Sequence, residues 1–123
     1  MSQGHSPPGW PRAVPPPEVP QWREAAVPWL LDHCPADYRA YSVWRRHPEA
    51  LAWIAAKHVA AQVEAMRSAY RVARIELAEQ VGPEALAEVL RALEAEGLRL
   101  RATARATELI AQAMSGTRFV PRL

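Results

Sequence analysis

The chain has 123 residues, of which 15 are basic and 13 acidic, so its formal net charge is only +2. This length allows one domain at most, and so small a charge does not by itself indicate a nucleic-acid partner. Lys57 is the only lysine, so the basic residues are almost all arginines. A composition rich in arginine, alanine and proline is typical of a GC-rich genome and excludes no function by itself.

The single cysteine, Cys34, bears on the compartment of the protein. It cannot form an intramolecular disulfide, and a reducing environment is therefore expected. The first residues lack the basic start and apolar run of a secretory signal. No stretch approaches the roughly 18 uncharged apolar residues of a membrane-spanning helix. The sequence thus predicts a soluble, cytoplasmic protein with no membrane partner.

Prolines crowd residues 1–20. They are Pro7, Pro8, Pro11, Pro15, Pro16, Pro17 and Pro20. Because proline fixes φ and lacks an amide donor, we expect this tract to be a disordered or extended tail. Trp10 leaves two roles open for the tract. It is either a linear motif for an aromatic groove, or a tail that packs on its own domain through Trp10 and Trp22.

Two short helices are expected between this tail and residue 48. The first covers residues 21–34, where Pro28 splits it and Pro35 ends it. The second covers residues 36–47 and places Tyr41 and Trp44 on nearly the same face. It ends before Pro48 because the residue preceding a proline avoids the helical region.

Two long helices form the centre of the predicted fold. The string Pro-Glu-Ala-Leu begins both, at Pro48 and Pro83, with the acid in the first turn, where the helix dipole favours it. We expect the helices over about 48–81 and 83–115, each stopped by a glycine. Because the connection around Gly82 is so short, they must pack as an antiparallel hairpin.

Apolar and small residues at three- and four-residue spacing predict the seam of this hairpin. They are Ala52, Ala56, Val59, Val63, Met66, Tyr70, Ala73 and Leu77 in the first helix, and Leu86, Leu90, Leu93, Gly97, Leu100, Ala104, Thr107, Ala111 and Met114 in the second. Close approach of the two backbones is one expected reason for Gly97, and a kink in the helix is the other. The prediction is an all-α domain over residues 21–115, a long hairpin covered by one or two short N-terminal helices, followed by a tail over 116–123.

The first long helix carries a second apolar stripe, on the side away from the seam. Its members are Leu51, Ile54, His58, Ala61, Ala65, Val72 and Ile75. A helix that is apolar on two faces is buried on both. We expect segment 21–47 to cover the stripe from Ile54 to Ala65 and a second copy of the chain to contact its C-terminal part. On the other long helix, Leu98 and Leu109 also point away from the seam. The candidate interaction surface is Ile54, Val72, Ile75, Leu98 and Leu109.

No residue pattern in the sequence predicts catalysis or metal binding. The candidate ligands lack the short spacing of zinc sites; they are His33, Cys34, His47 and His58. Cys34 also lacks the surroundings of a catalytic nucleophile, and there is no glycine-rich phosphate loop. We therefore expect no catalytic residue, no metal ligand and no cofactor.

Arginine rows on the long helices are the strongest other signal. The rows consist of Arg67, Arg71 and Arg74 on the first helix and Arg99, Arg101 and Arg105 on the second. Guanidinium groups in rows can contact phosphate, but the interleaved glutamates favour a solvated, salt-bridged face. We therefore predict a non-enzymatic helical interaction or adapter protein that self-associates or binds another protein. A nucleic-acid-associated regulator is the alternative.

Overall fold

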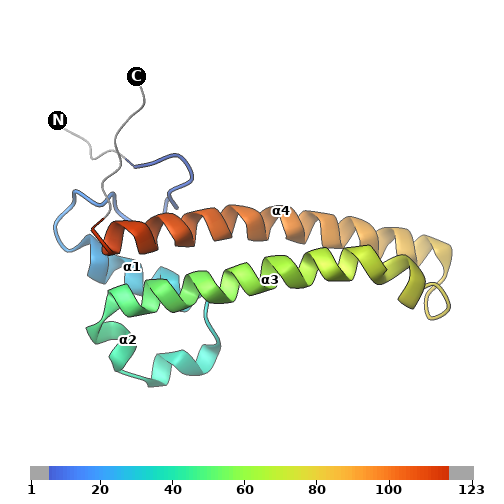
Figure 1. Cartoon of the computed structure of the whole chain (residues 1–123), viewed down its shortest axis with the longest axis horizontal. Helices are drawn as coiled ribbons and strands as arrows, with labels where there is room; N and C mark the ends of the chain where they lie inside the picture. Colours follow the sequence, from blue (N-terminus) through green and yellow to red (C-terminus); the bar gives the residue numbers. More distant parts are fainter. Residues whose placement is uncertain (1–5, 117–123) are drawn as a thin grey trace.

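The chain folds as a long helical hairpin with shorter helices gathered at one end (Figure 1). The computed structural model describes residues 6–116, and all regular structure in this range is helical. The helices are α1 (Trp22–Leu31), the 3₁₀ helix η1 (Ala36–Ala40), α2 (Val43–Arg46), α3 (Pro48–Glu76) and α4 (Pro83–Met114). The predicted all-α hairpin is confirmed. None of these helices offers the uninterrupted apolar length that a bilayer crossing requires.

The two long helices begin where the repeated Pro-Glu-Ala-Leu string predicts, at Pro48 and Pro83. However, α3 ends at Glu76 and not near residue 81. The amides of Gln80 and Val81 both donate to the carbonyl of Leu77, at 2.9 and 3.0 Å. These turn bonds reverse the chain, so the connection is a loop that begins before the glycine.

The short helices differ from the prediction. Pro28 lies inside α1 without splitting it. A proline removes only one backbone hydrogen bond, and buried residues on both sides of Pro28 hold the helix on the core. Residues 36–47 form η1 and α2 where one helix is predicted, because Tyr41 between them is extended, with φ −100° and ψ 111°. As a result, Tyr38 stacks on Trp44 at a ring-centroid distance of 5.2 Å, and Tyr41 is exposed.

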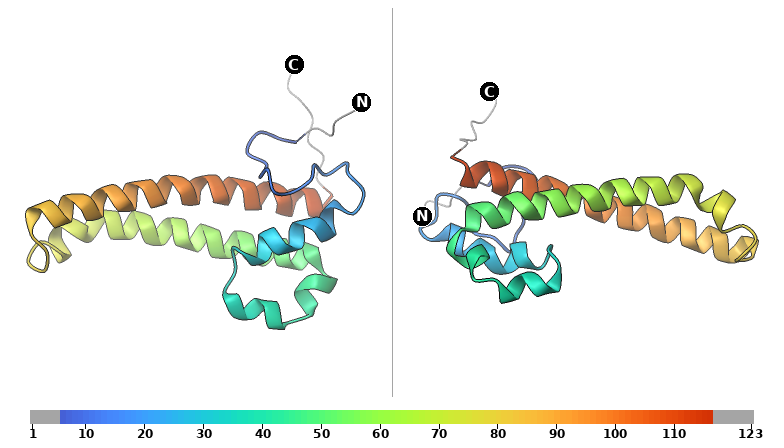
Figure 2. Two further views of the ribbon diagram at one scale, coloured as in Figure 1. Left: turned by 180° about the vertical axis from the view of Figure 1, so that it is seen from behind. Right: turned by 60° about the horizontal axis from the view of Figure 1, so that its bottom comes forward.

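The core lies at the end of the hairpin where the N-terminal segments gather, which we call the base. α1 and α2 pack against α3 there (Figures 1 and 2). The proline-rich tract also contributes to this core through Trp10 and Val14, which are 9% and 2% exposed. The indole Nε1 of Trp10 donates to the carbonyl of Val14 at 3.0 Å, and its ring lies 5.5 Å from that of Trp22. Of the two roles left open for this tract, residues 6–20 adopt the packed one.

The opposite end of the hairpin, which we call the arm, consists of α3 and α4 alone among the described elements (Figures 1 and 2). Every predicted seam residue along the hairpin is buried or half-buried. Burial varies along the seam: Val59, Ala73 and Leu90 are buried, whereas Val63 and Met66 are half-buried. The ends of the two expected tails, residues 1–5 and 117–123, lie outside the described residues.

Candidate interaction surface on the hairpin arm

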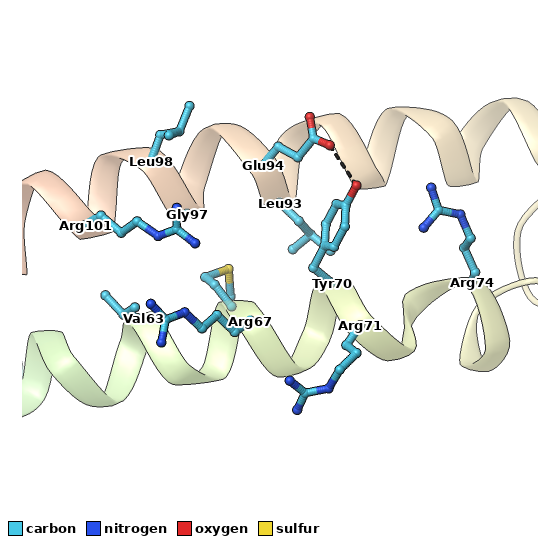
Figure 3. Close-up of a pocket in the computed structure, with 11 residues that line it drawn as sticks. Val63, Arg67, Tyr70, Arg71, Arg74, Leu93, Glu94, Gly97, Leu98 and Arg101 are labelled. Carbon is cyan, nitrogen blue, oxygen red and sulfur yellow. Dashed lines mark hydrogen bonds between the residues drawn. The ribbon is translucent and has the colours of Figure 1, made fainter.

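A groove opens between α3 and α4 on one side of the arm (Figure 3). Its volume is about 730 Å³. The apolar part of its lining comes from both helices and consists of Val63, Met66, Tyr70, Leu93, Gly97 and Leu98. The polar part consists of Arg67, Arg71, Arg74, Arg101 and Glu94. The groove therefore combines an apolar floor with four guanidinium groups and a single carboxylate.

The helical spacing of the arginines explains their place at the groove. Residues 67, 71 and 74 lie at i, i+4 and i+7, so α3 presents them on one face. Arg101 joins them from α4 and reaches into the gap between the helices, whereas Arg71 points away from α4 (Figure 3). The other two predicted phosphate contacts lie elsewhere: Arg99 borders a separate cavity at the base, and Arg105 lies beside Gly9.

The groove arginines differ in their partners. Arg67 Nη1 donates to Glu64 Oε1 at 2.6 Å, and the Arg74 guanidinium lies 5.9 Å above the ring of Tyr70. The Tyr70 hydroxyl donates to Glu94 at 2.7 Å and so joins the two helices. Within residues 6–116, Arg71 and Arg101 form no ion pair. The groove thus retains positive charge that the described part of the chain does not neutralise.

Gly97 lines the groove, and the space above it is empty. A Cβ added there would meet no atom within 4 Å. The expectation that Gly97 lets the backbones of α3 and α4 approach closely is therefore wrong. A glycine inside a helix costs about 1 kcal/mol relative to alanine, and no contact with the described residues offsets this cost. The space above Gly97 remains open to a molecule in the groove.

Two large apolar side chains are strongly exposed on the arm. Ile75 is 81% exposed and Leu98 is 68% exposed. The predicted surface also includes Ile54 and Leu109, but these lie at the base: Ile54 packs against the core, and Leu109 is 2% exposed. The chain's own N-terminal segments cover these two positions. The uncovered part of the predicted surface consists of Ile75, Leu98 and the half-buried Val72.

The second apolar stripe of α3 is covered over a shorter length than expected. Ile54 and His58 are half-buried, and His58 Nε2 lies 2.8 Å from the hydroxyl of Tyr38. Ala61 and Ala65 are already exposed. The N-terminal segment stops short of these alanines because η1 and α2 fold back at Tyr41 and do not run along α3.

A smaller cavity of about 340 Å³ lies at the base and brings together three of the four candidate ligand residues, His33, Cys34 and His58, but not His47. It is lined by Asp32, His33, Cys34, Pro35, His58, Gln62, Arg99 and Leu100. Burial raises the pKa of the Cys34 thiol, which keeps it protonated at neutral pH and makes it a weak nucleophile. Burial lowers the pKa of His33. Within the described range, no three His, Cys, Asp or Glu side chains gather as potential metal ligands.

The sequence pattern predicts the groove only in part. Its periodicity places Tyr70, Leu93 and Gly97 in the seam, because it gives the face of a helix but not the depth of burial. The row of arginines beginning at Arg67 was the available signal for this side of α3. No pattern singled out Trp53, which is exposed near the base of α3 beside Lys57, whose Nζ lies 5.8 Å from the Trp53 ring.

Comparison with known protein families, characterised proteins and solved structures finds no match to this chain. No relative therefore suggests a function for the groove or for the exposed face of α3.

Proposed function

We propose that this chain is a helical interaction protein without catalytic activity, and that it self-associates through the arm of its hairpin. The observation that carries the proposal is Ile75, which is 81% exposed on a helix that the described residues leave uncovered on that face. Helices in water are stabilised mainly by the burial of their apolar faces. Two hairpins that pack by their arms would form a four-helix bundle and bury Ile75 together with Val72. We place the protein in the cytoplasm, where the single thiol Cys34 stays reduced.

Light scattering on the intact chain tests this proposal, with Ile75→Glu as the variant. We expect a dimer at tens of micromolar for the intact chain and the monomer mass of 13.7 kDa for Ile75→Glu. Because Ile75 is exposed in the monomer, the substitution should leave the melting temperature nearly unchanged at low micromolar concentration, where the intact chain is monomeric. Ala25→Glu, which places the same charge on the exposed side of α1 at the base, should remain dimeric. A monomeric intact chain, or a dimer that Ile75→Glu does not dissociate, contradicts self-association by this face.

A nucleic-acid-associated regulator is the second candidate, and the observation in its favour is that three groove arginines, Arg71, Arg74 and Arg101, form no ion pair within residues 6–116. Fluorescence anisotropy with duplex DNA and RNA separates it from the first. Binding that falls steeply with salt and disappears in Arg67→Gln/Arg71→Gln/Arg74→Gln would support this candidate. No binding at physiological salt would leave the interaction protein as the better proposal.

A further inference from the structure

We propose that the groove between α3 and α4 is the docking site for an acidic amphipathic helix of a partner protein. The inference rests on the proposed function in that the arm binds other helices. It concerns a different surface, because Ile75 is not part of the groove lining.

The shape of the groove suits a helix. A helix that lies along the furrow between two antiparallel helices can insert its apolar side chains between them. Val63, Met66 and Leu93 form the floor that such side chains would contact, and Leu98 extends this apolar surface to the rim. The empty space above Gly97 lets the backbone or a large side chain of the incoming helix approach closely. An incoming helix would thus explain a helical glycine whose Cβ position faces open space among the described residues.

The charge of the groove selects the kind of helix. Arg67, Arg71 and Arg74 follow one edge, and Arg101 lies across from them. Among the described residues of the lining, the only carboxylate is that of Glu94, which already accepts a hydrogen bond from Tyr70. Arginine pairs with carboxylates through two parallel hydrogen bonds, and acids at i, i+4 and i+7 of a bound helix repeat the spacing of the arginines on α3. A helix with one apolar face and a flanking row of acids therefore complements this groove.

The sequence outside the described range does not supply such a helix. Residues 117–123 contain Arg118 and Arg122 and no acid, and residues 1–5 contain no acid either. Within the described range, the most acidic helical stretch is the start of α4, but its Leu86 and Leu90 lie in the seam of the hairpin. The occupant is therefore expected on another protein.

The apolar floor favours a helix over a nucleic acid. A sugar–phosphate backbone would contact the arginines but leave Val63, Met66 and Leu93 without apolar partners. Single-stranded nucleic acids bind by stacking their bases on exposed aromatic rings. Within residues 6–116, Tyr70 is the only aromatic residue of the lining, and the guanidinium of Arg74 already lies over its ring.

Binding of synthetic peptides to the full chain tests the inference. The probe is a labelled peptide of about 18 residues, with leucines on one helical face and flanking glutamates, measured by fluorescence anisotropy. The matched control peptide keeps the leucines and replaces each glutamate with lysine. We expect the acidic peptide to bind and the lysine peptide to bind at least about tenfold more weakly, a difference of about 1.4 kcal/mol.

Two variants locate the site. Arg71→Glu/Arg101→Glu should weaken binding of the acidic peptide at least about tenfold, since it reverses two groove charges that form no ion pair within residues 6–116. Arg23→Glu/Arg46→Glu, with the same change of charge at exposed positions of the base, should bind like the intact chain. Gly97→Leu should block the peptide while the melting temperature is kept or raised, because the added side chain meets open space.

Three results would overturn the inference. They are equal binding of both peptides, no binding of the acidic peptide, and a duplex RNA probe that binds more tightly than the peptide and is lost in Arg71→Glu/Arg101→Glu. Failure here is distinguishable from failure of self-association. Ile75→Glu leaves the groove intact and should still bind the acidic peptide whatever its mass, whereas light scattering reports on the dimer without the peptide.

Discussion

At the scale of single residues, two glycines differ in what an added methyl group would meet. At Gly97 a Cβ finds open space, so Gly97→Ala should raise the free energy of unfolding by about 1 kcal/mol through helix propensity alone. At Gly9 the φ angle is +95° and a Cβ would lie 2.8 Å from Arg105 Cγ, so Gly9→Ala should lower the free energy of unfolding. Urea denaturation of the two variants measures both effects. Loss of stability in Gly97→Ala would show that α3 fills the space above it.

His33 links stability to pH. Burial lowers the pKa of His33 below its ordinary value of 6.5; the charge of Asp32 opposes this shift and that of Arg99 adds to it. The folded state therefore binds the proton less readily than the unfolded state, and the free energy of unfolding falls as the pH drops below about 6.5. His33→Gln should reduce this fall between about pH 7 and about pH 5.5, whereas His47→Gln, at an exposed position, serves as the control. Denaturation curves over this pH interval measure the free energy of unfolding of each variant. Identical pH profiles for the intact chain and His33→Gln would show that His33 is not the group that links stability to pH.

At the scale of the helix, two leucines of α4 that are close in sequence have opposite environments. Leu100 is 4% exposed in the seam and Leu98 is 68% exposed at the groove. Leu100→Ala should lower the free energy of unfolding by about 2–4 kcal/mol, whereas Leu98→Ala should change it by less than about 0.5 kcal/mol. Thermal denaturation of the two variants compares them directly. Similar losses in both would place the seam on the wrong face of α4.

The same helices show how far sequence patterns predict this fold. The Pro-Glu-Ala-Leu starts and the three-four spacing predict the hairpin, because capping and periodicity are local properties of the chain. They do not give depth, since Val59 and Val63 share a face and only Val59 is fully buried. The groove opens where Val63, Met66 and Leu93 of the seam are only half-buried among the described residues, and periodicity alone cannot show where that is.

The N-terminal segments were harder to predict, because tertiary burial overrides the local preference of proline. The tract around Trp10 reads as an extended tail, yet Trp10 and Val14 enter the core. Pro28 reads as a break, yet burial of Leu30 and Leu31 holds α1 together across it. In both places, the apolar area that is buried outweighs the loss of one or two backbone hydrogen bonds.

At the scale of the whole molecule, the chain combines a compact base with an uncovered arm. The base holds the fully buried residues Leu30, Leu51 and Ile110, together with the packed N-terminal tract. The arm holds a seam in which Val63, Met66 and Leu93 are only half-buried, the arginine-lined groove and the exposed Ile75. Because local stability follows the density of buried apolar contacts, the arm of a free monomer should open more readily than the base. A partner on the arm would remove this difference.

Hydrogen–deuterium exchange at two protein concentrations tests the central claim, that the arm is an interaction surface used first by a second copy. At low micromolar concentration we expect backbone amides of 60–76 and 84–98 to exchange much faster than those at the base. At a concentration about a hundredfold higher, the amides around Val72 and Ile75 should gain protection as the arms associate, by mass action, and Ile75→Glu should gain none. An arm protected to the same degree at both concentrations, in the intact chain and in Ile75→Glu alike, would contradict the claim.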